Sequence, residues 1–116
     1  MEQLNRIELR GIVGSTRLQN YQGRNVIHFS LATSYVYKNK MGEPVIETTW
    51  HYVNAWDGKS MPDFSLIEKG SKLYVTGRLK SQRYVDNEGV ERVNYEVSAS
   101  QINILDQAGQ MQYEMM

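Results

Sequence analysis

Apolar and polar residues alternate along most of this chain, and that alternation limits its fold more than any other feature. Successive side chains of an extended strand point to opposite faces, so a period of two residues indicates strands with one packed face. Five such segments follow one another between turn-forming residues: 5–13, 26–37, 45–56, 72–84 and 90–105. The pattern predicts a protein of five β-strands.

The connections between these segments carry turn signals. Gly11 and Gly14 interrupt the first segment, where glycine indicates a bulge or a sharp bend. Residues 19–25 are polar and predict a turn, and residues 38–44 predict a basic hairpin loop. The stretch Asp-Asn-Glu-Gly at 86–89 predicts a tight hairpin.

One helix is predicted, over residues 60–69, with Ser60 as N-cap, Pro62 and Asp63 in the first turn, and Gly70 ending it. Five strands with one short helix between the third and fourth is the order of an OB-fold, a Greek-key barrel that often binds oligonucleotides. A β-sandwich or a different small barrel is the alternative, and the position of the helix disfavours the sandwich. We predict an all-β OB-fold domain over residues 1–105 and a short, flexible tail over residues 106–116.

Composition narrows the function classes. A chain of 116 residues suits one domain with a modest core, and its 13 basic and 13 acidic residues give a formal net charge of zero. Zero charge argues against a nucleic-acid binder that relies on charge alone, although a local basic stripe is compatible with it. There is no cysteine, no signal-peptide pattern in the first ten residues and no apolar run of membrane-spanning length, so a cytoplasmic protein without disulfides is expected.

The segment 48–56 contains both tryptophans. Trp50, Tyr52 and Trp56 share one predicted face with Asn54, whereas the other face carries β-branched and small residues and a histidine. We predict that the second face is packed. The aromatic face is either a stacking surface or a further part of the core, because large aromatics also dominate core burial.

Basic residues accompany most of the aromatic residues that fall outside the predicted core faces. The aromatic residues are Tyr37, Trp50, Tyr52, Trp56, Tyr74 and Tyr84, and the basic neighbours are Lys38, Lys40, Lys59, Arg78, Lys80 and Arg83. Every base has a flat face that can stack, and phosphates require nearby cations, so the interleaving favours single-stranded DNA binding without sequence preference. Any one of these lysines or arginines alone is typical of an ordinary solvated surface.

Catalytic and metal-binding patterns are missing. No nucleophile–base pair, phosphate-cradling loop or metal-ligand spacing is present. Two histidines, His28 and His51, are too few for a metal site without cysteines, and we expect both to be structural. We predict no enzymatic activity, no cofactor and no metal.

Several segments, in order along residues 5–105, resemble the bacterial single-stranded DNA-binding protein family. They are Asn5-Arg6-Ile7 through Gly14, Phe29-Ser30-Leu31-Ala32-Thr33-Ser34, Thr49-Trp50-His51, residues 69–79 (Lys-Gly-Ser-Lys-Leu-Tyr-Val-Thr-Gly-Arg-Leu) and Tyr95-Glu96-Val97. The resemblance implies an OB-fold that binds single-stranded DNA in replication, recombination and repair, usually as a homotetramer. The residues alone are equally compatible with a dimer.

The resemblance also implies site residues. Base-stacking positions fall on Tyr37, Trp50, Trp56 and Tyr84; phosphate-contacting positions fall on Arg6, Lys40, Lys59, Lys69, Lys80 and Arg83. Tyrosine stands where the family usually has tryptophan at Tyr37 and Tyr84, and tryptophan replaces phenylalanine at Trp56, so stacking is retained. His51 matches a histidine that lies at the family's subunit interface. Tyr52 stays ambiguous, because the family more often has a basic residue there.

The end of the sequence departs from the family pattern. The family usually carries a long tail with an acidic tip that recruits replication and repair enzymes, whereas this sequence ends Tyr-Glu-Met-Met. Either the chain is trimmed, or it is a tail-less member of the phage or mobile-element type without that recruitment. The alternative function is an OB-fold assembly or protein-interaction module of the primosome type, whose aromatics face a protein partner.

Overall fold

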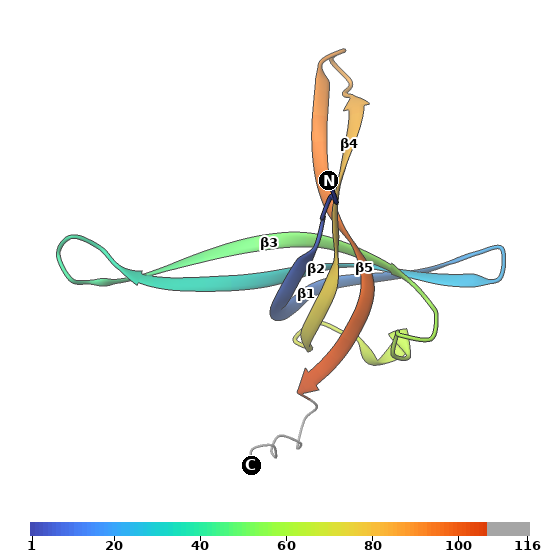
Figure 1. The fold of residues 1–116 in the computed structure, drawn as a ribbon, viewed down its shortest axis with the longest axis horizontal. Coiled ribbons are helices and arrows are strands. Elements are labelled where there is room, and N and C mark those ends of the chain that lie inside the picture. Colours follow the sequence, from blue (N-terminus) through green and yellow to red (C-terminus); the bar gives the residue numbers. More distant parts are fainter. Residues whose placement is uncertain (107–116) are drawn as a thin grey trace.

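Five long strands make up most of the computed structural model, which describes residues 1–106 (Figure 1). They are β1 (Ile7–Tyr21), β2 (Arg24–Lys38), β3 (Pro44–Trp56), β4 (Lys72–Val85) and β5 (Glu91–Asp106). The strands form a closed barrel in the order β1-β2-β3-β5-β4, and β4 pairs again with β1. All neighbours are antiparallel except β3 and β5, which pair in parallel over Val53 and Asn54. The predicted all-β OB-fold is confirmed.

Glycines let the strands of this small barrel approach and bend. In β1 the register slips between Val13 and Thr16, so that Gly14 and Ser15 together face Ser30, and a bulge forms near the predicted position. A Cβ atom on Gly14 would lie 2.5 Å from the ring of Trp50. Only glycine leaves room for that tryptophan at the bulge.

A second bulge in β5 was not predicted from the sequence. Thr76 faces Gln101 and Gly77 faces Ala99, so Ser100 is an extra residue on β5. The inward-facing side of β5 therefore changes from odd positions, such as Val97, to even positions, such as Ile102. A strict period of two from Val93 onward does not detect such a switch.

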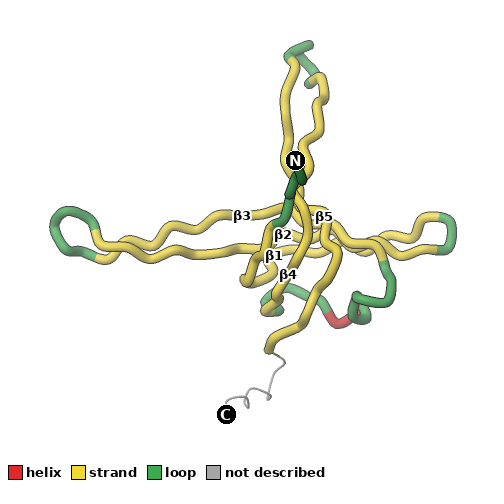
Figure 2. The backbone as a smooth tube through the Cα atoms, in the orientation of Figure 1, coloured by secondary structure: helices red, strands yellow, loops and turns green. Residues whose placement is uncertain are grey.

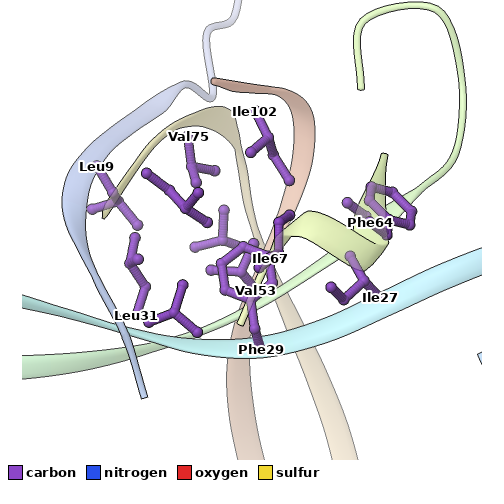
Figure 3. Packing of buried hydrophobic residues seen from close by; sticks show 13 residues of the cluster. Leu9, Ile27, Phe29, Leu31, Val53, Phe64, Ile67, Val75 and Ile102 are labelled. Atoms are coloured by element: carbon purple, nitrogen blue, oxygen red, sulfur yellow. The ribbon is translucent and has the colours of Figure 1, made fainter. Parts of the chain in front are cut away.

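The core lies inside the barrel and contains apolar residues from all five strands (Figure 3). Ile27, Phe29 and Leu31 of β2 are buried together with Leu9, Val13, Val53, Leu73, Val75, Val97 and Ile102. Phe64 and Ile67, from the connection between β3 and β4, are also buried in this cluster. This connection therefore covers part of the core rather than passing through solvent.

The helix predicted over residues 60–69 is wrong in extent and in its cap. Only a 3₁₀ turn forms, η1 (Phe64–Leu66), and Asp63 caps it by accepting hydrogen bonds from the Ser65 N–H at 3.0 Å and the Ser65 hydroxyl at 2.8 Å. Pro62 disfavours helical backbone at the residue before it, which separates Ser60 from the turn. The tighter 3₁₀ turn suits a short piece that must bury both Phe64 and Ile67.

Three hairpins continue beyond the barrel as two-stranded arms, which we call the β1–β2, β2–β3 and β4–β5 arms (Figures 1 and 2). The turn predicted over residues 19–25 is shorter than expected: Gln22 and Gly23 alone form it, with φ of 51° and 87°, and the strands run up to both sides. The polar residues around it belong to the strands, which an antiparallel ribbon with a solvent-exposed surface tolerates.

The other two predicted hairpin loops are confirmed. In the β2–β3 arm the Asn39 side-chain oxygen accepts from the N–H groups of Met41 and Glu43, at 2.9 and 3.0 Å. In the β4–β5 arm Asp86 accepts from the N–H groups at 88 and 90 and from the Arg92 Nε at 2.8 Å. The Arg92 hydrogen bond, together with these N–H groups, lowers the pKa of Asp86 below its ordinary range.

The N-terminal segment is fixed to the base of the β4–β5 arm. The Asn5 side-chain amide donates to the Leu79 carbonyl at 2.8 Å and accepts from the Leu79 N–H at 3.0 Å. One side chain thus replaces a strand partner for Leu79.

The predicted flexible tail lies outside the described residues except for Asp106, the last residue of β5. Among the described helices none is long and apolar enough to cross a membrane.

Candidate nucleic-acid interface

The predicted division of β3 into an aromatic and a packed face is confirmed. Trp50, Tyr52 and Trp56 are 54%, 66% and 41% exposed, whereas Val53 and Ala55 are buried. The strand register places Trp50 opposite Ala32 and Tyr52 opposite Ser30 on β2. Small neighbours on β2 leave the faces of these rings open, so the outer surface of β2 and β3 offers flat rings to solvent.

Trp56 lies in a cluster that the sequence reasoning did not identify. The ring of Tyr21, at the tip of the β1–β2 arm, is 6.0 Å from the Trp56 ring, and the guanidinium of Arg24 lies 5.0 Å from that ring's centre. Arg24 is also held at Asp57, with Nε 3.7 Å from Oδ1 and Nη2 donating to the carbonyl at 3.2 Å. A cation is thereby placed on an exposed aromatic ring, where both can contact a nucleotide.

The sequence contains the residues of this cluster, but their place beside Trp56 depends on the register of the strands. Tyr21 and Arg24 face each other across the tight turn of the β1–β2 arm. Because the sequence predicted a long polar turn there, neither residue was assigned to a strand beside Trp56.

Trp50 borders a hollow of about 410 Å³ on the same outer surface. Gly14 and Ser15 of the β1 bulge, Ser30, Tyr52 and Lys69 complete its lining. Lys69 is exposed and comes from the loop after η1. The structure therefore brings one predicted phosphate-contacting residue next to one predicted stacking residue.

A second hollow, of about 290 Å³, lies beside the first and shares Ser15, Ser30 and Tyr52 with it. It is more polar, and Arg17, His28, Asn54 and Glu96 contribute to its lining. Asn54 Nδ2 donates to Glu96 Oε2 at 2.9 Å. Burial, and then the charge of Arg17, lowers the pKa of His28, so this imidazole is neutral at neutral pH.

Tyr84 and Lys80 lie together on the β4–β5 arm. Both project from the same face of β4, where Tyr84 faces Arg92 and Lys80 faces Glu96. Arg83 points to the opposite face, and its Nη1 lies 3.6 Å from Glu91 Oε2. The structure thus separates Arg83 from the stacking residue next to it in sequence.

Tyr37 lies on the β2–β3 arm but on the face opposite to Trp50. It pairs in register with Val45, and its ring stacks on Tyr35 with centroids 6.0 Å apart. Lys40 is exposed in the loop at the tip of the same arm. A single strand that contacts both Tyr37 and Trp50 must pass from one face of this ribbon to the other.

Arg6 and Lys59 lie apart from the tryptophans' strand. Arg6 Nε lies 3.0 Å from Glu8 Oε2, and Glu8 also accepts from the Tyr74 hydroxyl. These interactions, the Tyr74 hydrogen bond first, lower the pKa of Glu8. The guanidinium of Arg10 stacks 5.5 Å from the centre of the Tyr74 ring. Lys59 is exposed in the connection after β3.

His51 faces away from the tryptophans, as predicted. Its Nε2 lies 2.9 Å from the Thr33 hydroxyl, and partial burial lowers its pKa. The subunit-interface role implied by the resemblance stays a prediction. Within residues 1–106, no group of three or more histidine, aspartate or glutamate side chains could hold a metal ion.

A closed five-stranded barrel with this strand order is an OB-fold, the fold whose strand 2–3 face often binds oligonucleotides or oligosaccharides. The profile of the Single-strand binding protein family matches residues 4–105. The chain therefore belongs to that family.

Individual relatives agree with this assignment. The single-stranded DNA-binding protein of Neisseria meningitidis serogroup A is 30% identical over 104 residues, covering 88% of this chain and 60% of the relative. The chain thus spans about three fifths of that relative's length. The Xylella fastidiosa protein called "Single-stranded DNA-binding protein 1" is 32% identical over 108 residues, covering 90% of this chain and 79% of the relative.

Solved structures show the same fold. A structure described as "Plasmodium falciparum SSB complex with ssDNA" superposes with a TM-score of 0.76 at 28% identity, covering 91% of this chain and 98% of the other. A deletion variant of the single-stranded DNA binding protein from Thermus aquaticus gives a TM-score of 0.73 at 22% identity, covering 92% and 53%. The second likeness concerns the fold alone.

Proposed function

We propose that this protein binds and protects single-stranded DNA without sequence preference during replication, recombination and repair. One observation carries the proposal: Trp50, Tyr52 and Trp56 are exposed on a surface supported by a packed barrel, with Arg24 and Lys69 beside them. The similar Plasmodium protein, whose structure is described as a complex with single-stranded DNA, supports it.

Stacking supplies the main part of the affinity in this proposal. Each base stacked on an aromatic side chain contributes about 1–3 kcal/mol by alanine substitution. Trp50 and Trp56 hold bases on the barrel, and Tyr37 and Tyr84 extend the path over two arms. Phosphates pass along the predicted cations, namely Arg6, Lys40, Lys59, Lys69, Lys80 and Arg83, with Arg24 added by its place on Trp56. Arg6, Arg24 and Arg83 are each paired with a carboxylate, so they contribute less to phosphate binding than the lysines do.

We propose in addition that the protein acts as a homo-oligomer. The family resemblance implies a tetramer, and a dimer is the alternative. Two-stranded arms are marginally stable alone, yet these arms expose large apolar residues on their faces, including Val36, Ile46, Val93 and Tyr95. A second copy that covers them, with His51 near the contact, explains how they stay ordered. Light-scattering mass measurement decides between dimer and tetramer.

The proposed activity is binding without catalysis, since the relatives are named for binding. We also propose a cytoplasmic location, because the proposed ligand is DNA.

Tryptophan fluorescence tests the proposal directly. Stacking of thymine bases on Trp50 and Trp56 is expected to quench the emission during titration with oligo-dT, more weakly as salt rises. Absence of quenching and of binding at low salt would contradict the proposal. The alternative, a protein-interaction module, predicts that Trp50→Ala and Trp56→Ala abolish capture of a protein partner and leave oligonucleotide binding unchanged.

A further inference from the structure

We infer that the smaller hollow, between β1, β2, β3 and β5, is a subsite for one base and favours a base with an exocyclic amino group over one with a carbonyl at that position. This inference rests on the proposed function. It deepens that function by adding a base preference to a surface that otherwise stacks any base.

The size and walls of the hollow suit a single base. Its volume of about 290 Å³ lies at the lower limit of ordinary ligand pockets. Arg17 from β1, His28 from β2, Asn54 from β3 and Glu96 from β5 lie around it, and Tyr52 lines its edge. Tyr52 also lines the hollow next to Trp50, so a base here is a neighbour of a base stacked on that tryptophan.

Glu96 determines which chemical group the hollow accepts. Among the described residues it is the one carboxylate that lines this hollow, and it makes no salt bridge. Asn54 occupies Oε2 with its amide at 2.9 Å, which leaves Oε1 available as an acceptor. A carboxylate repels phosphate, so the part of the nucleotide that meets Glu96 is an N–H group on the base.

Cytosine and uracil present opposite groups to such an acceptor. Cytosine offers the N4 amino donor, which glutamate accepts in known base contacts, whereas uracil and thymine offer the O4 carbonyl. Arg17 adds a donor on the opposite wall for the adjacent ring acceptors. Lys80 and His28 are the other ionisable groups near Glu96: Lys80 faces it in register across β4 and β5, and His28 is neutral. Lys80 only donates, and the acceptor nitrogen that neutral His28 retains carries no negative charge, so among the described residues Glu96 is the anionic acceptor of this hollow.

The test compares oligo-dC with oligo-dU of equal length, because the two bases have the same size and homopolymers remove any question of register. Mildly alkaline buffer keeps cytosine unprotonated. One hydrogen bond to a carboxylate predicts that the wild-type protein binds oligo-dC at least about tenfold more tightly than oligo-dU. Glu96→Gln retains an acceptor for Asn54 but removes the charge and adds a donor, and it is expected to bring the affinity ratio close to one.

Glu91→Gln is the matched control, because it makes the same chemical change on the β4–β5 arm, outside the hollow. It is expected to keep the wild-type ratio. The ratio within each variant is independent of the fraction of folded protein, so partial unfolding of Glu96→Gln does not imitate the effect. Equal ratios for the wild type and Glu96→Gln would overturn the inference. Absence of wild-type binding to both oligonucleotides at low salt would overturn the proposed function instead.

Discussion

The barrel and the arms are built from the same strands, but they use the alternation of side chains differently. In the barrel one face of each strand is buried, and residues such as Leu31 have no exposed surface. In the β4–β5 arm the same inward parity continues past the barrel, where Leu79 is 44% exposed. Alternation therefore defines inside and outside only where a second layer exists. The proposed stacking residues divide in the same way, with Trp50 and Trp56 on the barrel and Tyr37 and Tyr84 on arms.

The largest expected difference between the two regions is in stability. Leu31→Ala leaves a cavity in a packed core and is expected to lower the free energy of unfolding by about 2–5 kcal/mol. Leu79→Ala removes the same atoms from the arm, where Leu79 is exposed in the single chain, and is expected to cost under about 0.5 kcal/mol in protein diluted below the concentration at which it associates. Denaturant unfolding of both variants measures the two values. An equally large loss for Leu79→Ala would show that the arm face is covered in solution.

The next largest difference concerns DNA affinity. Trp50→Ala removes a ring held by the barrel and is expected to weaken oligo-dT binding by about 2–3 kcal/mol, the upper part of the range for one stacked base. Tyr84→Ala removes a smaller ring from an arm that has no barrel core behind it, so about 1 kcal/mol is expected. Titrations at one salt concentration give both numbers. A larger loss for Tyr84→Ala would reverse the assignment of the main stacking surface to the barrel.

A smaller effect on DNA affinity is expected from a substitution at the β1 bulge. Gly14→Ala places a methyl group 2.5 Å from the Trp50 ring, so the ring must move while remaining present. We expect a loss of oligo-dT affinity of about 0.5–1 kcal/mol, below that of Trp50→Ala. Gly58→Ala is the matched control, since nothing lies within 4 Å of its added Cβ. Unchanged affinity in Gly14→Ala would mean that the position of Trp50 does not matter for stacking.

The smallest effect, a change in the pH dependence of stability, is expected at His51, where the barrel passes into the β2–β3 arm. Burial lowers the pKa of His51 below its ordinary value of 6.5, so the unfolded chain binds this proton more readily than the folded protein. The associated stability is complete above the unfolded value and is lost as pH falls through the lowered, folded value. Melting temperatures measured from neutral pH downward are expected to fall less steeply in His51→Gln, whose amide can still bond Thr33.

His28→Gln serves for comparison, because the pKa of His28 is also lowered, mainly by burial. Each single variant is expected to remove part of the pH dependence, and the double variant more than either. An unchanged slope in His51→Gln would remove this residue from the acid response.

Much of the barrel could be predicted from the sequence, because packed strands impose a period of two on their residues. The inward positions from Ile27 to Leu31, the loop at Asn39 and the turn at Asp86 all follow from local chemistry. The β5 bulge at Ser100 could not be predicted, since it is fixed by pairing with β4. The helix was overestimated because capping signals were present, while the burial of Phe64 and Ile67 that shortened it is a tertiary effect.

The sequence predicted which residue types make up the candidate site more completely than it predicted which of them lie next to one another. Alternation was sufficient to expose Trp50 and Trp56 together. It was not sufficient to place Arg24 on Trp56, which requires the exact register of β1 and β2. It does place Arg83 and Tyr84 on opposite faces, but the ion pair of Arg83 with Glu91 also depends on the register of β4 and β5.

The parallel pairing of β3 with β5 has a mechanical consequence. It spans Val53 and Asn54 alone, whereas the opposite closure of β1 on β4 runs from Ile7 to Ile12. Fewer backbone hydrogen bonds must break to part β3 from β5 than to part any other pair of neighbouring strands. Under tension the barrel would split first between β3 and β5 and open into a sheet in which β1 stays between β2 and β4. The backbone amides that join β3 to β5 would exchange with solvent before those that join the other pairs of strands.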